Sequence, residues 1–379
     1  MARERQATEQ SRQRNKGGVL NNRERFLSLM NYQPVDRLPV VDLEPLEELA
    51  MKQWRTEGLP QGVDHIRFLG MSELVQTGGV RVQPIPKFEE KILSEEEEYF
   101  SQVTELGATV RRRKDAPNTF YGHTDFPIKT RKDWEEYRKR LNPADSAQRL
   151  EGILEPGNVK RLNASADPVG LGFFPYFFRF GFYTMGMEGF LTAFYEEEDL
   201  IHEMFEQAAS VLTANLQMIL ENVNIDFAHF CEDLAGTHGP LVSPAIYDKF
   251  WAPHQKPILK ILKEAGVRVI CMWSAGRFEE LIPTMMDHGF NCTWPVERNA
   301  GMNPIDLRRR FGRGLLLGGG ISLRALIEGP EAIDSEIEEL MPLIEEGGFI
   351  PALDDMVPLE CPFSHYRHMV ERLKAIRLG

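Results

Sequence analysis

Acidic side chains stand directly after most of the short apolar runs in this sequence. In chain order, these residues are Asp42, Glu44, Glu232, Asp233, Glu297, Asp354 and Asp355. If several of them share one site, their mutual repulsion raises some of their pKa values, so that they can exchange protons near neutral pH. We expect Asp233, Glu297 and Asp355 to handle protons or to bind a cation. The structural alternative for each one is the first turn of a helix, which favours acidic side chains.

Aromatic and basic residues accompany this acidic set. Trp273 and Trp294 end two apolar runs, Arg277 follows the first of them, and Tyr176 and Arg179 belong to the segment FFPYFFRFGFY (173–183). We expect Trp273 and Tyr176 to shape a substrate pocket, Arg277 to orient an anionic part of the substrate, and Arg179 and Glu44 to contact the substrate too. The aromatic segment is either an apolar lid or wall over the site or a contact in a homodimer. Core packing is the alternative for the tryptophans.

The apolar runs predict the strands of a parallel sheet. They are residues 169–174, 225–230, 267–273, 290–294, 314–320 and 348–353, and helical stretches separate them. Continuous apolar runs of this length are typical of strands that are buried on both faces. Nearer the N-terminus, residues 38–43 (LPVVDL) predict a first strand, residues 65–70 a further strand, and residues 78–113 a hairpin region.

These elements favour one (β/α)8 TIM barrel, formed by residues 21–379, with N-terminal helical and hairpin elaborations. Residues 1–20 predict a disordered polar tail. A Rossmann GxGxxG is missing after the predicted first strand, so a closed barrel is favoured over an open doubly wound sheet. Catalytic groups of such barrels lie at the carboxyl ends of the strands. The acidic and aromatic residues should therefore meet at one mouth of the barrel.

Composition argues against several classes of function. The formal net charge is −13, and outside the N-terminal tail basic residues cluster only at residues 111–114. This distribution disfavours nucleic acid and anionic membranes as partners. No run of about 18 apolar residues predicts a membrane-spanning helix. The four cysteines, Cys231, Cys271, Cys292 and Cys361, form no CxxC pair, so we expect free, structural thiols in a cytoplasmic protein.

Three stretches resemble the uroporphyrinogen decarboxylase superfamily. They are NNRERFLSLMNYQPVDRLPV (21–40), EDLAGTHGPLVSPAIYDKFWAPHQKPIL (232–259), and SAGRFEELIPTMMDHGFNCTWPVERNAGMNP (274–304) with FGRGLLLGGGIS (311–322). The resemblance implies a (β/α)8 barrel. It also implies one of two kinds of activity, because the superfamily contains tetrapyrrole decarboxylases and cobalamin-linked methyltransferases that use methylated thiols, methanol, methylamines or aryl methyl ethers.

The chain departs from the decarboxylases of the superfamily after its predicted first strand. Those enzymes carry an arginine-bearing RQAGR loop that neutralises the carboxylates of their substrate. The matching stretch here is DLEPLEELAMKQW (42–54), which is acidic and has no arginine before Arg55. Electrostatic repulsion therefore disfavours a substrate with many carboxylates.

The chain also departs from the zinc-dependent thiol methyltransferases of the superfamily. Those carry H-x-C at the end of the fifth strand, where this chain has Trp273-Ser274-Ala275, and other relatives carry H-S-D-G where it has W-S-A-G. The thiolate zinc site is therefore absent. A zinc ion held by carboxylates and a histidine is the alternative, with ligands among Glu232, Asp233, His238 and Asp355, and it would activate a methoxy or methylamine group.

The sequence thus predicts a methyltransferase that moves a methyl group from a small methylated donor to the cobalt of a corrinoid carried by a partner protein. The first alternative is a decarboxylase of uroporphyrinogen or of another carboxylate, which would place a proton on the developing carbanion. The second is a barrel that binds a corrinoid or a tetrapyrrole and has lost its chemistry.

Overall fold

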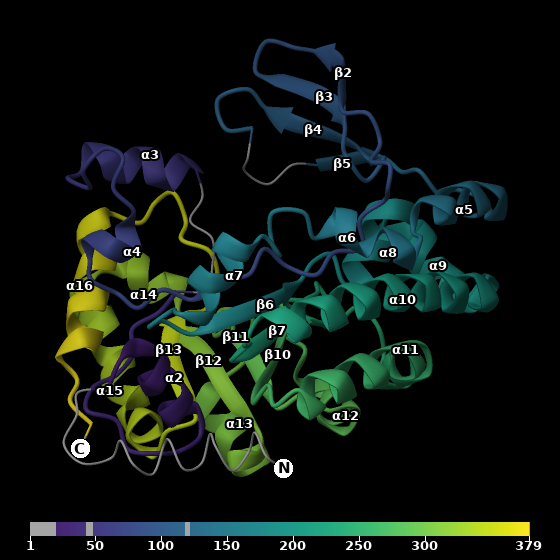
Figure 1. Ribbon diagram of the computed structural model, residues 1–379. Helices are drawn as coiled ribbons and strands as arrows, with labels where there is room; N and C mark the ends of the chain where they lie inside the picture. The colour runs from purple at the N-terminus through teal and green to yellow at the C-terminus, as the bar shows by residue number, and fades with distance from the viewer. Residues whose placement is uncertain (1–19, 43–47, 118–121, 379) are drawn as a thin grey trace.

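The computed structural model describes residues 20–42, 48–117 and 122–378 (Figure 1). The predicted tail of residues 1–20, apart from Leu20, lies outside the described residues, and so does Glu44. Among the described helices, none is long and apolar enough to cross a membrane.

A curled parallel sheet forms the centre of the molecule (Figure 1). Its strands, in spatial order, are β1 (Val75–Gln76), β6 (Val169–Phe173), β7 (Phe227–Cys231), β10 (Val269–Trp273), β11 (Cys292–Val296), β12 (Leu316–Ile321) and β13 (Phe349–Leu353). All neighbouring pairs are parallel. The last six strands confirm the six apolar runs predicted as strands, with ends that agree within two residues. Their side chains are nearly all buried, as expected for a sheet covered by helices.

Helices connect these strands in sequence. They are α8 (Phe177–Met185), α9 (Met187–Glu196) and α10 (Glu198–Asn222) after β6, α11 (Pro244–Glu264) after β7, α12 (Ile282–His288) after β10, α13 (Pro304–Phe311) after β11, α14 (Leu323–Glu328) and α15 (Pro330–Glu346) after β12, and α16 (Phe363–Ala375) after β13. A small hairpin of β8 (Ala235–Gly236) and β9 (Gly239–Pro240) lies between β7 and α11. Local chemistry sets the ends of α11 and α12: the Ser243 hydroxyl accepts from Ile246 N at 3.2 Å, and Gly289 ends α12 at φ +123°. This alternation makes the fold TIM-barrel-like.

The predicted first strand does not form over its described part, residues 38–42. These residues are largely buried, yet Val40 makes the single ladder-like contact, in which its carbonyl accepts from Ser72 N at 2.8 Å. Pro39 has no N–H to donate, which explains part of the loss. The strand predicted at residues 65–70 is also wrong, because α4 (His65–Phe68) begins there with Asp64 as its N-cap. Within the described residues, β1 and β13 remain the two ends of the sheet, so its closure into a ring is not seen.

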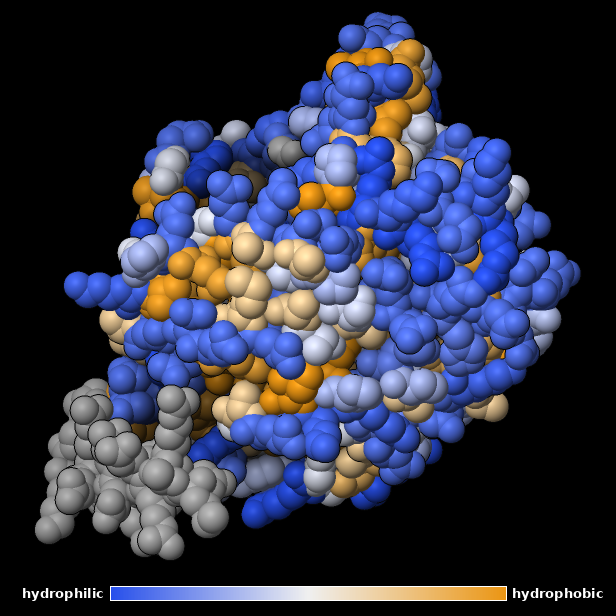
Figure 2. Space-filling model, turned by 45° about the vertical axis from the view of Figure 1, so that its right-hand side comes forward, coloured by the Kyte–Doolittle hydropathy of each residue, from blue (hydrophilic) through white to orange (hydrophobic). Residues whose placement is uncertain are grey.

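A second, antiparallel sheet projects from the barrel-like body (top of Figure 1). Its strands are β2 (Lys91–Glu95), β3 (Tyr99–Val103), β4 (Thr109–Arg113) and β5 (Gly122–Asp125), paired in that order. They confirm the predicted hairpin region and extend it by one strand. The face drawn in Figure 2 is mainly hydrophilic, but hydrophobic residues gather over the left and middle of the body and on the projection at the top. In β2, Ile92 and Leu93 are more than half exposed.

Helices precede and follow this second sheet. The N-terminal ones are α2 (Asn22–Met30) and α3 (Glu48–Thr56), and α5 (Arg131–Tyr137), α6 (Ser146–Arg149) and α7 (Pro156–Asn163) lead from β5 back to β6. Short 3-10 turns occupy residues 138–140, 143–145, 279–281 and 312–314.

The aromatic segment 173–183 is mostly core and not a lid. It forms the end of β6 and most of α8, where Phe177, Phe178 and Phe180 have no exposed surface. Both sequence-based alternatives, an apolar lid and a subunit contact, are therefore wrong for most of its rings. Phe174 is the most exposed of them, with 38% of its surface exposed, and Phe182 and Tyr183 are half-buried. The segment is apolar because α8 packs into the helical layer beside the sheet.

Candidate functional site at the carboxyl ends of the strands

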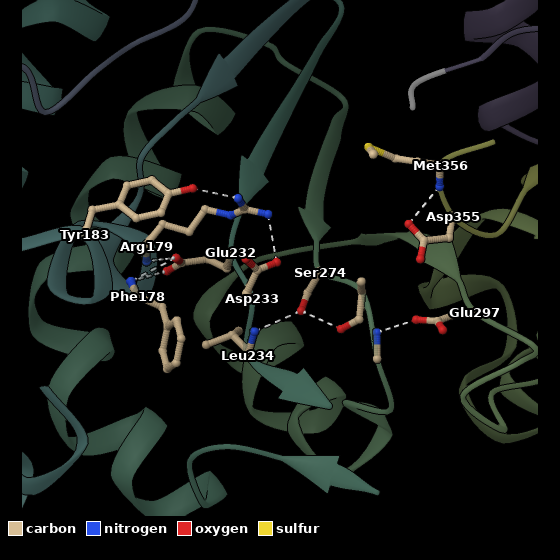
Figure 3. Close-up of polar contacts among 12 residues, drawn as sticks. Phe178, Arg179, Tyr183, Glu232, Asp233, Leu234, Ser274, Glu297, Asp355 and Met356 are labelled. Carbon is tan, nitrogen blue, oxygen red and sulfur yellow. Dashed lines mark hydrogen bonds and ion pairs between the residues drawn. The ribbon is translucent and has the colours of Figure 1, made fainter. Parts of the chain in front are cut away.

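The carboxyl ends of four strands bring together the polar residues that the sequence singled out. Asp233 follows β7, Trp273 ends β10, Glu297 follows β11, and Asp355 follows β13, while α8 contributes Arg179. Figure 3 shows Arg179 and Asp233 on one side and Glu297 and Asp355 on the other. We call this set the mouth.

Arg179 is a cation of the mouth and already has hydrogen-bond partners. Its Nη2 donates to Asp233 Oδ1 at 2.7 Å, and its Nη1 donates to the Tyr183 hydroxyl at 3.0 Å (Figure 3). The guanidinium carbon lies 5.4 Å from the centre of the Trp273 ring and 5.2 Å from that of Phe174. Only 6% of the residue is exposed, so its charge is held between an acid and two rings.

The three predicted carboxyls of the mouth have raised pKa values. Burial is the first cause for each, and Arg179 opposes it at Asp233. The negative charge of Asp233 raises the pKa of Asp355 further, and the charge of Asp355 does the same at Glu297. A raised pKa shifts a carboxyl toward the neutral acid, the form that can donate a proton. These three carboxyls are therefore the candidate acid or base groups of the mouth.

Glu232, next to Asp233, points away from the mouth. Its carboxylate accepts from Phe178 N at 2.8 and 2.9 Å, from Arg179 N at 3.1 Å and from the Trp251 indole N–H at 3.1 Å. It thereby satisfies N–H groups at the start of α8, which otherwise have no partner within the helix. Burial raises the pKa of Glu232 to about 7, although these hydrogen bonds oppose the rise. Its role is to hold α8, and with it Arg179, against β7.

Asp354 and Asp355 form a second pair of neighbouring acids in which one is buried and the other lies at the mouth. It has no exposed surface, and its carboxylate accepts from Arg298 N at 2.9 Å, Leu323 N at 3.0 Å and Asn299 N at 3.4 Å. Burial raises its pKa to about 7. Asp354 thus joins three connecting segments, whereas Asp355 is partly exposed at the mouth.

The turn after β10 shows what Ser274 and Gly276 do, the two residues that W-S-A-G shares with H-S-D-G. The Ser274 hydroxyl accepts from Leu234 N at 3.1 Å and donates to Ala275 O at 3.1 Å. Gly276 N donates to Glu297 Oε2 at 2.6 Å. Gly276 adopts φ +81°, and a Cβ there would lie 2.5 Å from Ala235 O, so only glycine fits this close approach. The turn therefore orients the backbone after Asp233 and the carboxylate of Glu297.

Other predicted residues lie away from the mouth. Tyr176 is fully buried between Phe177 and Phe230, so it does not line the open site. Arg277 and His238 are exposed at the rim. Trp294 is buried against Gly318 inside the barrel-like sheet, and Glu44 lies outside the described residues.

The proposed zinc ligands do not form a metal site in this arrangement. Within residues 20–42, 48–117 and 122–378, no group of three or more His, Cys, Asp or Glu side chains is placed to hold a metal ion. Both oxygens of Glu232 accept hydrogen bonds from N–H groups, and His238 lies exposed in the β8–β9 turn. Neither residue fits a shared site with Asp233 and Asp355.

Cys231 is a mouth residue that the sequence reasoning assigned to the core. It is partly exposed at the end of β7. The pKa of Arg179 is raised: burial lowers it, but the neighbouring Cys231 and Asp233 raise it by more. The Cys231 thiol therefore lies within electrostatic range of the guanidinium. The sequence could have indicated this position of Cys231. Side chains two residues apart on a strand share one face, so Cys231 lies on the same face as Asp233.

Comparisons with known proteins agree with this architecture. Residues 126–376 match the family model described as uroporphyrinogen decarboxylase (URO-D). The chain is similar in structure to a methyltransferase from Methanosarcina mazei, with a TM-score of 0.64 and 16% sequence identity over 93% of this chain and 98% of that chain. At this identity the likeness shows a common fold. A comparison with curated proteins found no match.

Proposed function

The chain belongs to the uroporphyrinogen decarboxylase family, and on that premise we propose that it transfers a methyl group from a small methylated donor to the cobalt of a corrinoid held by a partner protein. The observation that carries the proposal is the mouth itself. It places Asp233, paired with Arg179, on one side and Glu297 and Asp355 on the other, and burial raises the pKa of all three acids.

Such a mouth suits the cleavage of a methyl–heteroatom bond. The electron pair of the reduced cobalt forms the bond to the methyl carbon, and the carbon–heteroatom bond breaks with its electrons on the heteroatom. The leaving atom then takes a proton from a carboxylic acid of the mouth, for which we assign Asp355. The donor leaves as an alcohol, a phenol, an amine or a thiol, and the cobalt carries the methyl group. Trp273 bounds the space in which the donor lies.

Electrostatics favour this reading over decarboxylation of a tetrapyrrole. A substrate with many carboxylates needs several cations, whereas the mouth offers three acids, Asp233, Glu297 and Asp355. Its arginine, Arg179, already donates to Asp233 and to the Tyr183 hydroxyl. The shared fold with a methyltransferase supports the proposal as well. The corrinoid protein would dock at the rim, where Arg277 and His238 are exposed.

The proposal is tested by the visible spectrum of anaerobically generated cob(I)alamin with the purified chain. The donor panel consists of methyl ethers, methylamines and methylated thiols. Appearance of methylcobalamin with one class supports methyl transfer and names the donor class. Consumption of uroporphyrinogen, without methylation from any donor, would replace the proposal by decarboxylation. Tight binding of cobalamin without turnover of either kind would indicate the inactive binding barrel.

A further inference from the structure

The inner face of β7 continues the mouth into the barrel-like sheet. Phe230 meets Tyr176 edge-on with ring centres 4.8 Å apart, on the side of the outer helices, so its neighbours His229 and Cys231 face the interior. Both are partly exposed, whereas Phe230 is fully buried. A strand rises about 3.3 Å per residue, so His229 lies roughly 7 Å below Cys231. Partly exposed side chains therefore line this face from the end of the strand down to His229.

Two rings of the interior lie over glycines, on either side of β10. His229 is in register with Gly172 of β6, and a Cβ on that glycine would lie 2.8 Å from His229 Nε2. The six-membered ring of Trp294 covers Gly318 of β12, where a Cβ would lie 1.9 Å away. Trp273 of β10 is in register with Trp294 and is partly exposed. The two glycines thus let both rings lie back against the sheet, and Trp273 remains accessible between them.

Both rings carry a buried polar atom without a hydrogen-bond partner. In the part of the chain that the structure describes, these atoms are His229 Nδ1 and the indole Nε1 of Trp294, a residue that is only 3% exposed. The Trp294 atoms that cover Gly318 are Cδ2, Cε3 and Cζ3, so the indole N–H lies on the opposite edge and points away from β12. Burial lowers the pKa of His229 to about 4, so its ring is neutral at pH 7. Buried polar atoms of this kind usually meet a water or a ligand.

The charges around these atoms favour an uncharged ligand. At the top of this face, Arg179 and Asp233 already pair with each other at 2.7 Å. The residues in register with His229 on the two neighbouring strands are Gly172 and Cys271. A charged group beside His229 would lose its hydration without gaining a counter-ion. A hydroxyl group fits, because its oxygen accepts from an indole N–H and its O–H donates to a neutral imidazole nitrogen.

We propose that His229 and Trp294 bind the hydroxyl group of a small uncharged methyl donor, at the end of the donor remote from its reacting methyl group. The inference rests on the proposed function, under which the methyl group points outward to the rim where the corrinoid partner docks. Trp273 flanks the chain between the two ends. Methanol and methylamine are too short to reach His229 from the acids of the mouth, so the donor is an open chain of several carbons.

Nuclear magnetic resonance of the indole N–H groups tests the site without any methyl transfer. The full chain, labelled with nitrogen-15 tryptophan, is titrated with 4-methoxybutan-1-ol and with 1-methoxypentane, in which a methyl group replaces the hydroxyl. We expect the methoxy alcohol to shift the Trp294 signal saturably and to bind roughly tenfold more tightly than the ether. The Trp294→Phe variant assigns the signal by its loss.

Trp134 provides the matched control signal. Its indole N–H is also buried without a partner among the described residues, but it lies on α5, outside the barrel-like sheet. Its signal should not move. Absence of a saturable shift at Trp294, or equal affinity for the alcohol and the ether, overturns the proposal.

Matched variants then assign the two contacts by isothermal titration calorimetry. His229→Leu removes the imidazole and Trp294→Phe removes the indole N–H, so each should weaken binding of 4-methoxybutan-1-ol roughly five- to tenfold. His229→Asn offers an amide oxygen in place of Nδ1 and should keep most of the affinity, which a merely structural role of His229 would not produce. Trp134→Phe should leave the affinity unchanged.

Equal affinity in the wild type, His229→Leu and Trp294→Phe would overturn the assignment of these residues. Failure of cobalamin methylation with every donor, while the methoxy alcohol still binds at Trp294, would count only against the proposed function.

Discussion

Replacement of Glu232 by glutamine should change how the stability of the protein depends on pH. Burial raises the pKa of this carboxyl from 4.5 to about 7, so the folded state binds the proton more tightly than the unfolded state does. The contribution of Glu232 to the free energy of unfolding is therefore greatest below pH 4.5, and it is lost as the pH rises through 7. Because one pKa unit corresponds to about 1.4 kcal/mol, the loss is roughly 3 kcal/mol.

Glutamine resembles the protonated acid in shape and cannot ionise, but its NH2 group cannot accept the N–H hydrogen bonds that one oxygen of Glu232 accepts. We therefore expect Glu232→Gln to be less stable than the wild type at pH 5 by roughly 1–3 kcal/mol. Between pH 5 and pH 8, the difference in free energy of unfolding between the variant and the wild type should shift by roughly 3 kcal/mol in favour of the variant. Urea denaturation followed by circular dichroism at both pH values measures this change.

Glu338→Gln is the matched control, because Glu338 is exposed on α15. Its difference from the wild type should be the same at both pH values. An equal destabilisation of Glu232→Gln at pH 5 and pH 8 would refute the reasoning. It would mean that the three N–H donors of Phe178, Arg179 and Trp251 fully compensate the burial of the charge.

Two further predictions concern the sheet and the mouth. Gly318→Ala should destabilise the protein by about 1–3 kcal/mol in thermal or urea unfolding, because a Cβ there would lie 1.9 Å from the Trp294 ring. Gly236→Ala is the control. A Cβ at Gly236 has nothing within 4 Å, so this variant should change the free energy of unfolding by less than about 0.5 kcal/mol. Equal effects would show that the Trp294 ring moves aside freely. Arg179→Gln should raise the pKa of Asp233 further, because Arg179 lowers it. Any limb of the pH–rate profile that Asp233 sets should therefore move to higher pH. An unchanged profile would exclude Asp233 from that limb.

The sequence predicted the central sheet well because its strands are buried. A buried parallel strand needs apolar side chains on both faces, and that pattern is visible in residues 227–231 and 269–273 without any structure. The segment 38–42 has a similar composition but makes few ladder hydrogen bonds, which composition does not reveal. The aromatic run 173–183 was misassigned because the same rings suit a lid, an interface or a core, and only the packing of α8 decides.

The site was predicted in part, for a reason visible in its acidic pairs. In Glu232–Asp233 and in Asp354–Asp355, one member is buried and accepts backbone N–H groups, and the other reaches the mouth. Neighbouring residues at a strand end point to opposite sides, so one of each pair had to turn away. Which one turns inward depends on N–H groups of other segments, far away in the sequence.

The most direct test of the central claim compares the rate of cob(I)alamin methylation in the wild type, in Asp355→Asn and in Glu136→Gln, an exposed control. The donor is the one that the spectral panel identifies. If a carboxylic acid of the mouth protonates the leaving group, Asp355→Asn should lower the rate by about 100-fold or more, and Glu136→Gln should leave it unchanged. Methylation at the wild-type rate in Asp355→Asn, or no methylation by the wild type with any donor, would contradict the account.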